Sequence, residues 1–159
     1  MRFKSLVWLA ILLPLSTLGL EIYPQVSGTI IEIKPVKTQV EKGDVIVRLD
    51  DRQSKLELQY LRTLQSIKQQ DFDDKKLELQ QTKELYERLV NSHRDLEIAQ
   101  LAFDATKREL DAHNLKVKIA QIELEKYTIT SPISGVIKNL PNQRNVVNIN
   151  APKVLMIIE

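Results

Sequence analysis

The most regular pattern of apolar and polar positions lies in the middle of the chain. Residues 51–127 contain no glycine and no proline, which favours long helices. In the second half of this stretch, positions separated alternately by three and four residues form one seam, occupied by Leu96, Ala99, Phe103, Thr106, Leu110, His113, Val117, Ala120, Leu124 and Tyr127. This heptad spacing predicts a long α-helix that packs along one face against another helix.

The first half of the stretch carries a weaker seam with the same spacing, which predicts a partner helix in the same chain. A turn centred on residues 92 and 93 would pair the two seams. In that register the facing pairs include Leu89 with Leu96, Phe72 with His113, and Leu61 with Leu124. We therefore expect an antiparallel coiled-coil hairpin about 55 Å long at about 1.5 Å per residue. Two separate bundle helices, or one long helix that dimerises with another chain, are the alternatives.

The segments on either side of the helical stretch have the composition of β-strands. Residues 22–50 and 128–159 are rich in valine and isoleucine and are interrupted by glycine, proline and asparagine. Each segment is too small to bury a core alone, so we expect the two to pack as one β-domain that the hairpin interrupts. The core residues expected to meet are Ile31, Ile33, Val45 and Val47 from the first segment, and Ile129, Val136, Val154 and Ile157 from the second. The predicted fold class is α+β.

The first 20 residues have the layout of an export signal. Arg2 and Lys4 precede an apolar run, and the small residues Thr17 and Gly19 follow it at the spacing of a cleavage site. The run has about 15 residues, fewer than the roughly 20 that a membrane-spanning helix needs. We expect residues 1–20 to be a cleaved signal peptide, with an uncleaved membrane anchor or a buried helix as alternatives. Either of the first two readings places the rest of the chain outside the cytoplasm.

Composition and charge exclude several classes of site. The sequence has no cysteine, which excludes disulfides, thiolate catalysis, cysteine-based zinc sites and a lipid anchor on cysteine. The net charge of +2 offers no electrostatic case for binding nucleic acid. Asp71, Asp73 and Asp74 point in different directions on a helix, and His93 and His113 have no ligand-spaced neighbours, so we expect no metal site. No nucleophile–base pair or phosphate-binding loop is present, so we expect neither enzymatic activity nor a cofactor.

The two β-segments resemble a known family. The sequences VSGTI at residues 26–30 and VEKGDVI at 40–46 are similar to the first half of a biotinyl/lipoyl-like domain, and ITSPISGVI at 129–137 is similar to the second half. Lys37 stands at a turn position where the family usually has glycine. Two such halves separated by a helical hairpin are the pattern of the HlyD-like membrane fusion proteins, which are periplasmic adaptors. The resemblance implies a split lipoyl-like domain, a β-sandwich hybrid, interrupted by a coiled-coil hairpin.

The same resemblance implies a function and its partners. It suggests a periplasmic adaptor of an efflux or secretion system that bridges an inner-membrane transporter and a TolC-type outer-membrane channel, and that self-associates into a ring. Family members continue into a β-barrel and a membrane-proximal domain, so we expect a minimal or truncated adaptor. The alternatives are a structural envelope coiled-coil protein without a transporter partner, and a lipoyl or biotinyl carrier domain.

The hairpin tip is the candidate partner-binding site. In the family, an arginine, a leucine and a serine at the tip meet the outer-membrane channel, and Arg88, Leu89 and Ser92 match these residue types. With His93 and Arg94 beside them, they form the expected partner-binding set at a tip placed at about residues 90–95. The alternative is a plain polar turn between two helices.

Overall fold

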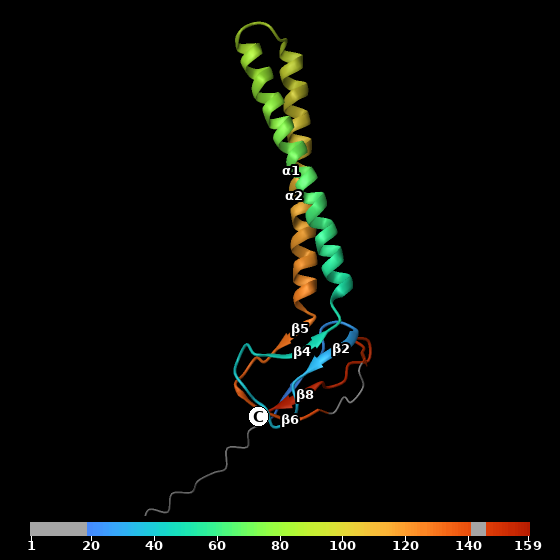
Figure 1. Ribbon diagram of the computed structural model, residues 1–159. Helices are drawn as coiled ribbons and strands as arrows, with labels where there is room; N and C mark the ends of the chain where they lie inside the picture. The colour runs from blue at the N-terminus through green and yellow to red at the C-terminus, as the bar shows by residue number, and fades with distance from the viewer. Residues whose placement is uncertain (1–18, 141–145) are drawn as a thin grey trace, which may run out of the picture.

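Figure 1 shows the computed structural model of the protein, in which a long helical hairpin stands on a small β-domain. The structure describes residues 19–140 and 146–159. Helix α1 spans Arg52–Glu87 and helix α2 spans His93–Glu125, and the two pack against each other along their length. The predicted intrachain hairpin is therefore present. Its longer helix has 36 residues, which gives a rod of about 54 Å at about 1.5 Å per residue.

The export segment predicted over residues 1–20 lies outside the described residues, apart from its last two positions. Leu20 already belongs to the first strand of the β-domain. Across residues 19–140 and 146–159, no helix combines the length and apolarity that a membrane crossing requires.

Within residues 19–140 and 146–159, eight short strands form the β-domain. They are β1 (Leu20–Ile22), β2 (Gly28–Ile33), β3 (Gln39–Val40), β4 (Val45–Leu49), β5 (Thr128–Thr130), β6 (Gly135–Asn139), β7 (Val146–Val147) and β8 (Met156–Ile158). One sheet has the strand order β1-β8-β6-β3 and the other has the order β5-β4-β2-β7, with antiparallel pairing throughout. The domain is thus a sandwich of two small sheets.

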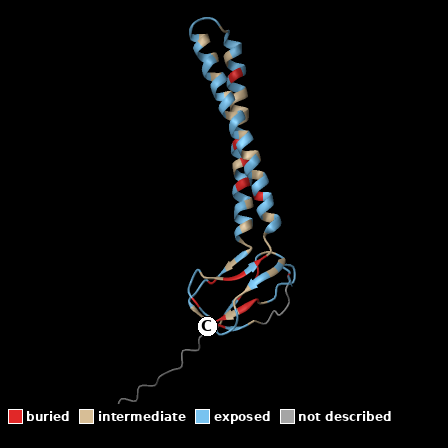
Figure 2. Ribbon diagram, viewed as in Figure 1, coloured by how far each residue is buried: buried red, intermediate tan, exposed pale blue. Residues whose placement is uncertain are grey.

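The two terminal segments interleave within both sheets. Each sheet takes two strands from before the hairpin and two from after it. The buried core is likewise shared, and its members are Ile22, Val40, Ile46, Val47, Leu49, Ile137, Val147, Leu155, Met156 and Ile158. In Figure 2 the buried stretches, in red, lie on strands of both sheets. The prediction that the segments on either side of the hairpin pack as one β-domain is confirmed.

The choice of core residues was right in part, and β-bulges explain the difference in the first segment. Val47 is fully buried, and Ile33 and Ile129 are half-buried against the core, but Ile31 is 63% exposed. The β2–β4 ladder shifts register between Ile30 and Glu32, so the extra residue Ile31 is turned out of the alternating pattern. A second shift in the β4–β5 ladder falls at Ile46, which becomes fully buried. A bulge inverts the inside–outside alternation that the sequence prediction assumed.

The hairpin leaves and re-enters the β-domain at one point. The Leu49 amide donates to the Tyr127 carbonyl at 2.8 Å, and the Asp50 amide donates to the Thr29 carbonyl at 2.8 Å. The Arg52 guanidinium donates two hydrogen bonds to the Asp50 carboxylate, at 2.6 and 2.9 Å. These bonds lower the pKa of Asp50 to about 2. Backbone hydrogen bonds and the Arg52–Asp50 ion pair thus hold the start of α1 and the end of α2 together at one junction with the sheets.

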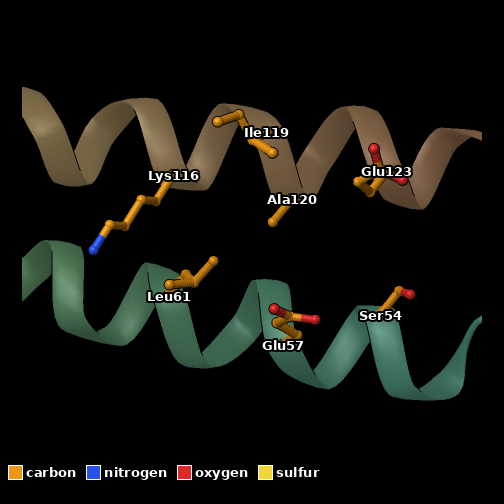
Figure 3. Close-up of a pocket in the computed structure, with 7 residues that line it drawn as sticks. All are labelled: Ser54, Glu57, Leu61, Lys116, Ile119, Ala120 and Glu123. Carbon is orange, nitrogen blue, oxygen red and sulfur yellow. The ribbon is translucent and has the colours of Figure 1, made fainter.

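The pairing of the two helices differs from the predicted register. Phe72 packs against Phe103 with ring centroids 5.3 Å apart, and not against His113. The Lys68 ammonium donates to Glu109 at 2.7 Å. In Figure 3, Leu61 faces α2 between Lys116 and Ala120, in a groove between the helices that Leu124 does not line.

The partner residues on α2 therefore lie closer to the hairpin tip than predicted, by about one heptad, or roughly seven residues. Instead, the His113 Nε2–H donates to the Leu61 carbonyl oxygen at 2.7 Å, and the ring is buried. His113 is therefore a packed, hydrogen-bonded residue of the seam.

Candidate functional site: the hairpin tip

The turn at the tip is short and its backbone is strained. It runs from Arg88 to Ser92, between the end of α1 and the start of α2. The Val90 amide donates to the Leu85 carbonyl at 2.9 Å, which closes the last turn of α1. This closure needs a left-handed residue at position 89, and Leu89 has φ 59°. A left-handed conformation costs a residue with a Cβ atom about 1–2 kcal/mol, which is why glycine or asparagine usually stands at such a position.

Two apolar side chains project from this turn into solvent. Leu89 is 92% exposed and Val90 is 65% exposed. Within a single chain, these side chains gain nothing from burial, and the backbone at Leu89 is strained as well. Strain and exposed apolar surface at one position are features that a partner surface can compensate.

Ser92 and Asp95 begin helix α2 with a reciprocal cap. The Ser92 amide donates to the Asp95 carboxylate at 2.9 Å, and the Asp95 amide donates to the Ser92 hydroxyl at 3.3 Å. The hydroxyl itself donates to the carboxylate at 2.6 Å. These bonds to Ser92 lower the pKa of Asp95. Such a capping box fixes where the helix starts and so fixes the shape of the turn. The side chain of Ser92 therefore has a structural role in the isolated chain.

The charged residues predicted for the site surround the apolar pair. Arg88 forms the C-cap of α1, and Arg94 is the second residue of α2; both are exposed. Neither makes an ion pair in the part of the chain that the structure describes. His93 meets Tyr86 edge to face, with ring centroids 6.1 Å apart. It also lines a groove of about 480 Å³ below the turn, together with Leu96.

The structure brings all five predicted residues to one end of the hairpin, on both sides of the turn. Val90 belongs with them and was missed by the sequence analysis. Two consecutive apolar residues, Leu89 and Val90, between charged and polar neighbours were the available signal. The resulting surface is an exposed apolar pair, Leu89 and Val90, between two arginines, which suits docking against another protein.

Other parts of the described chain offer weaker candidates. In residues 19–140 and 146–159, no three histidine, aspartate or glutamate side chains are close enough together to hold a metal ion. Ser131 is buried, but its hydroxyl donates to the Ile133 carbonyl at 2.6 Å, as a turn residue does.

Comparison with known proteins gives structural matches alone. No protein-family model matches the sequence, and no curated protein matches it. Among solved structures, the membrane fusion protein Spr0693 from Streptococcus pneumoniae R6 superposes with a TM-score of 0.70 at 14% identity, covering 88% of this chain and 60% of that one. The soluble domain of LipC, a membrane fusion protein of a type I secretion system, gives a TM-score of 0.58 at 14% identity, covering 89% and 99%.

MacA from Actinobacillus actinomycetemcomitans gives a TM-score of 0.53 at 24% identity. The match covers 87% of this chain but 48% of MacA, so the chain spans about half the length of that protein. These similarities show the fold: a lipoyl-like β-domain interrupted by an α-hairpin, as in membrane fusion proteins and periplasmic adaptors.

Proposed function

We propose that this protein is a non-enzymatic adaptor of an efflux or secretion system, held outside the cytoplasm by its N-terminal segment. The β-domain is the base of the adaptor, and the hairpin carries the tip away from it. The tip docks on an outer-membrane channel, and the base faces an inner-membrane transporter. Several copies assemble side by side to surround the path of the substrate.

The observation that carries this proposal is the tip. Its apolar residues are exposed, one of them on a strained backbone, at the far end of a rod that is otherwise regular. A structural coiled-coil protein that spans the envelope without a partner has no use for a strained leucine at that position. The fold, shared with membrane fusion proteins, supports the same function.

The carrier-domain alternative has no support in the fold. A carrier presents one modified lysine on a tight turn between the two halves of its domain. Here the chain between Leu49 and Tyr127 forms the two long helices. The hairpin therefore occupies the place at which a carrier domain would present its lysine.

The test separates the role of Leu89 in folding from its role in docking. A photo-crosslinking amino acid at Val90, in living cells of the native host, should link the tip to an outer-membrane channel protein that mass spectrometry identifies. Leu89→Asn should abolish this link and leave the protein as stable as before, because asparagine tolerates the left-handed conformation. Ile31→Asn is the matched control, since Ile31 is 63% exposed on the β-domain; it should keep the link. Crosslinks at Val90 that survive Leu89→Asn, or that never include a channel, would reject the proposal.

A further inference from the structure

Each helix of the hairpin carries a second apolar stripe outside the seam, and two of its members, Leu101 and Ile119, also border grooves between the two helices. The stripe positions follow those of the seam by two residues, which places them about 200° around the helix. On α1 the stripe consists of Leu56, Tyr60, Thr63, Ile67, Gln70, Asp74, Leu77 and Gln81. On α2 it consists of Ile98, Leu101, Ala105, Arg108, Ala112, Leu115, Ile119 and Ile122. We call these the α1 stripe and the α2 stripe.

The large residues of both stripes are exposed. Leu56, Tyr60, Ile67 and Leu77 on α1 are 51–66% exposed, and Ile98, Leu101, Leu115, Ile119 and Ile122 on α2 are 54–61% exposed. The seam already satisfies the packing of one helix on the other, so these heptad-spaced residues are not needed to hold the hairpin together. A second heptad stripe on an exposed helix face is the pattern of a further helix–helix contact.

The two stripes run at matching heights, and large apolar residues face each other in some of their layers. The contacts of Gln65 with Asn114 and of Lys68 with Glu109 fix the relative heights of the two helices. At equal heights the stripe residues pair as Leu56 with Ile122, Tyr60 with Ile119, Thr63 with Leu115, Ile67 with Ala112, Gln70 with Arg108, Asp74 with Ala105, Leu77 with Leu101, and Gln81 with Ile98. Large apolar residues thus meet at the base and again nearer the tip.

The polar positions of the stripes are complementary in charge. Asp74 is the acidic residue of the α1 stripe and Arg108 is the basic residue of the α2 stripe, one layer apart. One layer is about 6 Å, a distance that an arginine side chain spans. Within the described residues, neither Asp74 nor Arg108 makes an ion pair.

From this match we infer that the α1 stripe of one copy packs on the α2 stripe of the next copy at the same height, with Asp74 and Arg108 setting the register. Packing like stripes at equal height would bring Asp74 against Asp74 or Arg108 against Arg108, which repel. A two-fold dimer would also leave one stripe of each copy exposed. A head-to-tail contact uses both stripes, and a ring of such contacts leaves none exposed. The inference rests on the side-by-side assembly in the proposed function and specifies its interface.

Single-cysteine variants test which stripes meet, because the chain has no cysteine of its own. Leu77→Cys and Leu101→Cys, carrying different epitope tags, are produced together in the native host and treated with a short bismaleimide. The expected product is a dimer that carries both tags. Dimers that carry one tag twice, as a two-fold contact would give, would overturn the inference, and so would the absence of any dimer.

Charge reversal tests the register. Arg108→Asp and Asp74→Arg should each lower the yield of the mixed dimer by about tenfold, because each places like charges together. The double reversal within one chain should restore the yield. Lys107→Asp, an equal change of charge at the exposed neighbouring position, should leave it unchanged. Single reversals without effect would remove Asp74 and Arg108 from the interface.

The photo-crosslink at Val90, measured in the same cells, separates this inference from the proposed function. Mixed dimers without a channel contact would preserve the interface and reject the adaptor. A channel contact without mixed dimers would support the adaptor function and reject the interface between the α1 stripe and the α2 stripe.

Discussion

At the scale of single residues, three left-handed positions among those that the structure describes shape the protein's turns. Lys37, Gly43 and Leu89 have φ values of 67°, 96° and 59°. Lys37 stands at the turn position for which the family resemblance implies glycine. Its positive φ explains why glycine suits that turn. The strain at Leu89 was not predictable in the same way. It depends on where α1 ends, which the heptad pattern alone leaves open.

The two turn residues of the β-domain give a paired stability prediction. Gly43→Ala should lower the free energy of unfolding by about 1 kcal/mol through backbone strain alone, because a Cβ atom there would meet nothing within 4 Å. Lys37→Gly should raise it by about 0.5 kcal/mol, since relief of strain exceeds the entropy cost of glycine. Urea unfolding followed by circular dichroism measures both. Lys42→Gly is the control for Lys37→Gly and should lower the free energy of unfolding, because Lys42 does not have a positive φ. If Lys42→Gly raised the free energy of unfolding as well, the gain at Lys37 would not come from its positive φ.

At the scale of elements, the hairpin shows how a repeating pattern determines a fold but not its register. A seam with a seven-residue repeat matches its partner equally well after a shift of one heptad. The observed turn at 88–92 is centred two to three residues before the predicted turn at residues 92 and 93. In an antiparallel hairpin, moving the turn changes the facing residue on the partner helix by twice that number. The capping box of Ser92 and Asp95 starts α2 at His93. A turn centred on residues 92 and 93 is therefore excluded, because His93 already belongs to the helix.

The observed register predicts a specific pattern of crosslinks. With cysteines at Gln65 and Asn114, whose side chains hydrogen-bond at 2.6 Å, a short bismaleimide should link the two helices within one chain. The pair Leu61 and Leu124 of the alternative register should react much more slowly, since the partners lie about 10 Å apart along the axis after a shift of roughly seven residues. Peptide mapping after proteolysis distinguishes the two. A faster reaction of the Leu61 and Leu124 pair would restore the predicted register.

The sequence was sufficient for the kind of each element but not for every contact. Absence of glycine and proline between residues 51 and 127 identified the helices, and the valine- and isoleucine-rich ends identified the strands. The bulges at Ile31 and Ile46 were not encoded in any local pattern, so the alternation rule chose Ile31 and left out Ile46. At the tip, residue types pointed to the segment that forms the turn, whereas the exposure of Val90 became apparent only from the geometry of that turn.

At the scale of the whole molecule, the β-domain and the hairpin are separate structural units joined at one junction. Helices and strands have few contacts with each other beyond the residues next to the junction. The two chain ends of the β-domain are already adjacent there, through the hydrogen bond between Leu49 and Tyr127. The β-domain therefore owes its core to the interleaved strands and not to the rod above it.

Replacing residues 51–126 by a short Gly/Ser linker should leave a folded β-domain, because closing a short loop costs little between ends that already touch. We expect strand-rich circular dichroism and one cooperative urea transition, with loss of the channel contact that the tip provides. The same deletion carrying Ile137→Asp is the control, because Ile137 is fully buried and its replacement should unfold the domain. An unfolded parent deletion would mean that the hairpin supplies stability to the sheets.

The interleaving of strands also determines the order in which the protein can be built. As long as only the first four strands have emerged, neither sheet can close, because each sheet includes strands that follow the helices. Those early strands present unpaired edges, which attract chaperones and proteases. The helices form in microseconds from local contacts, and their pairing brings the late strands to the early ones. Closure of the hairpin thus precedes assembly of the sheets. A substitution that slows this closure should therefore slow folding of the β-domain even where its final stability is unchanged.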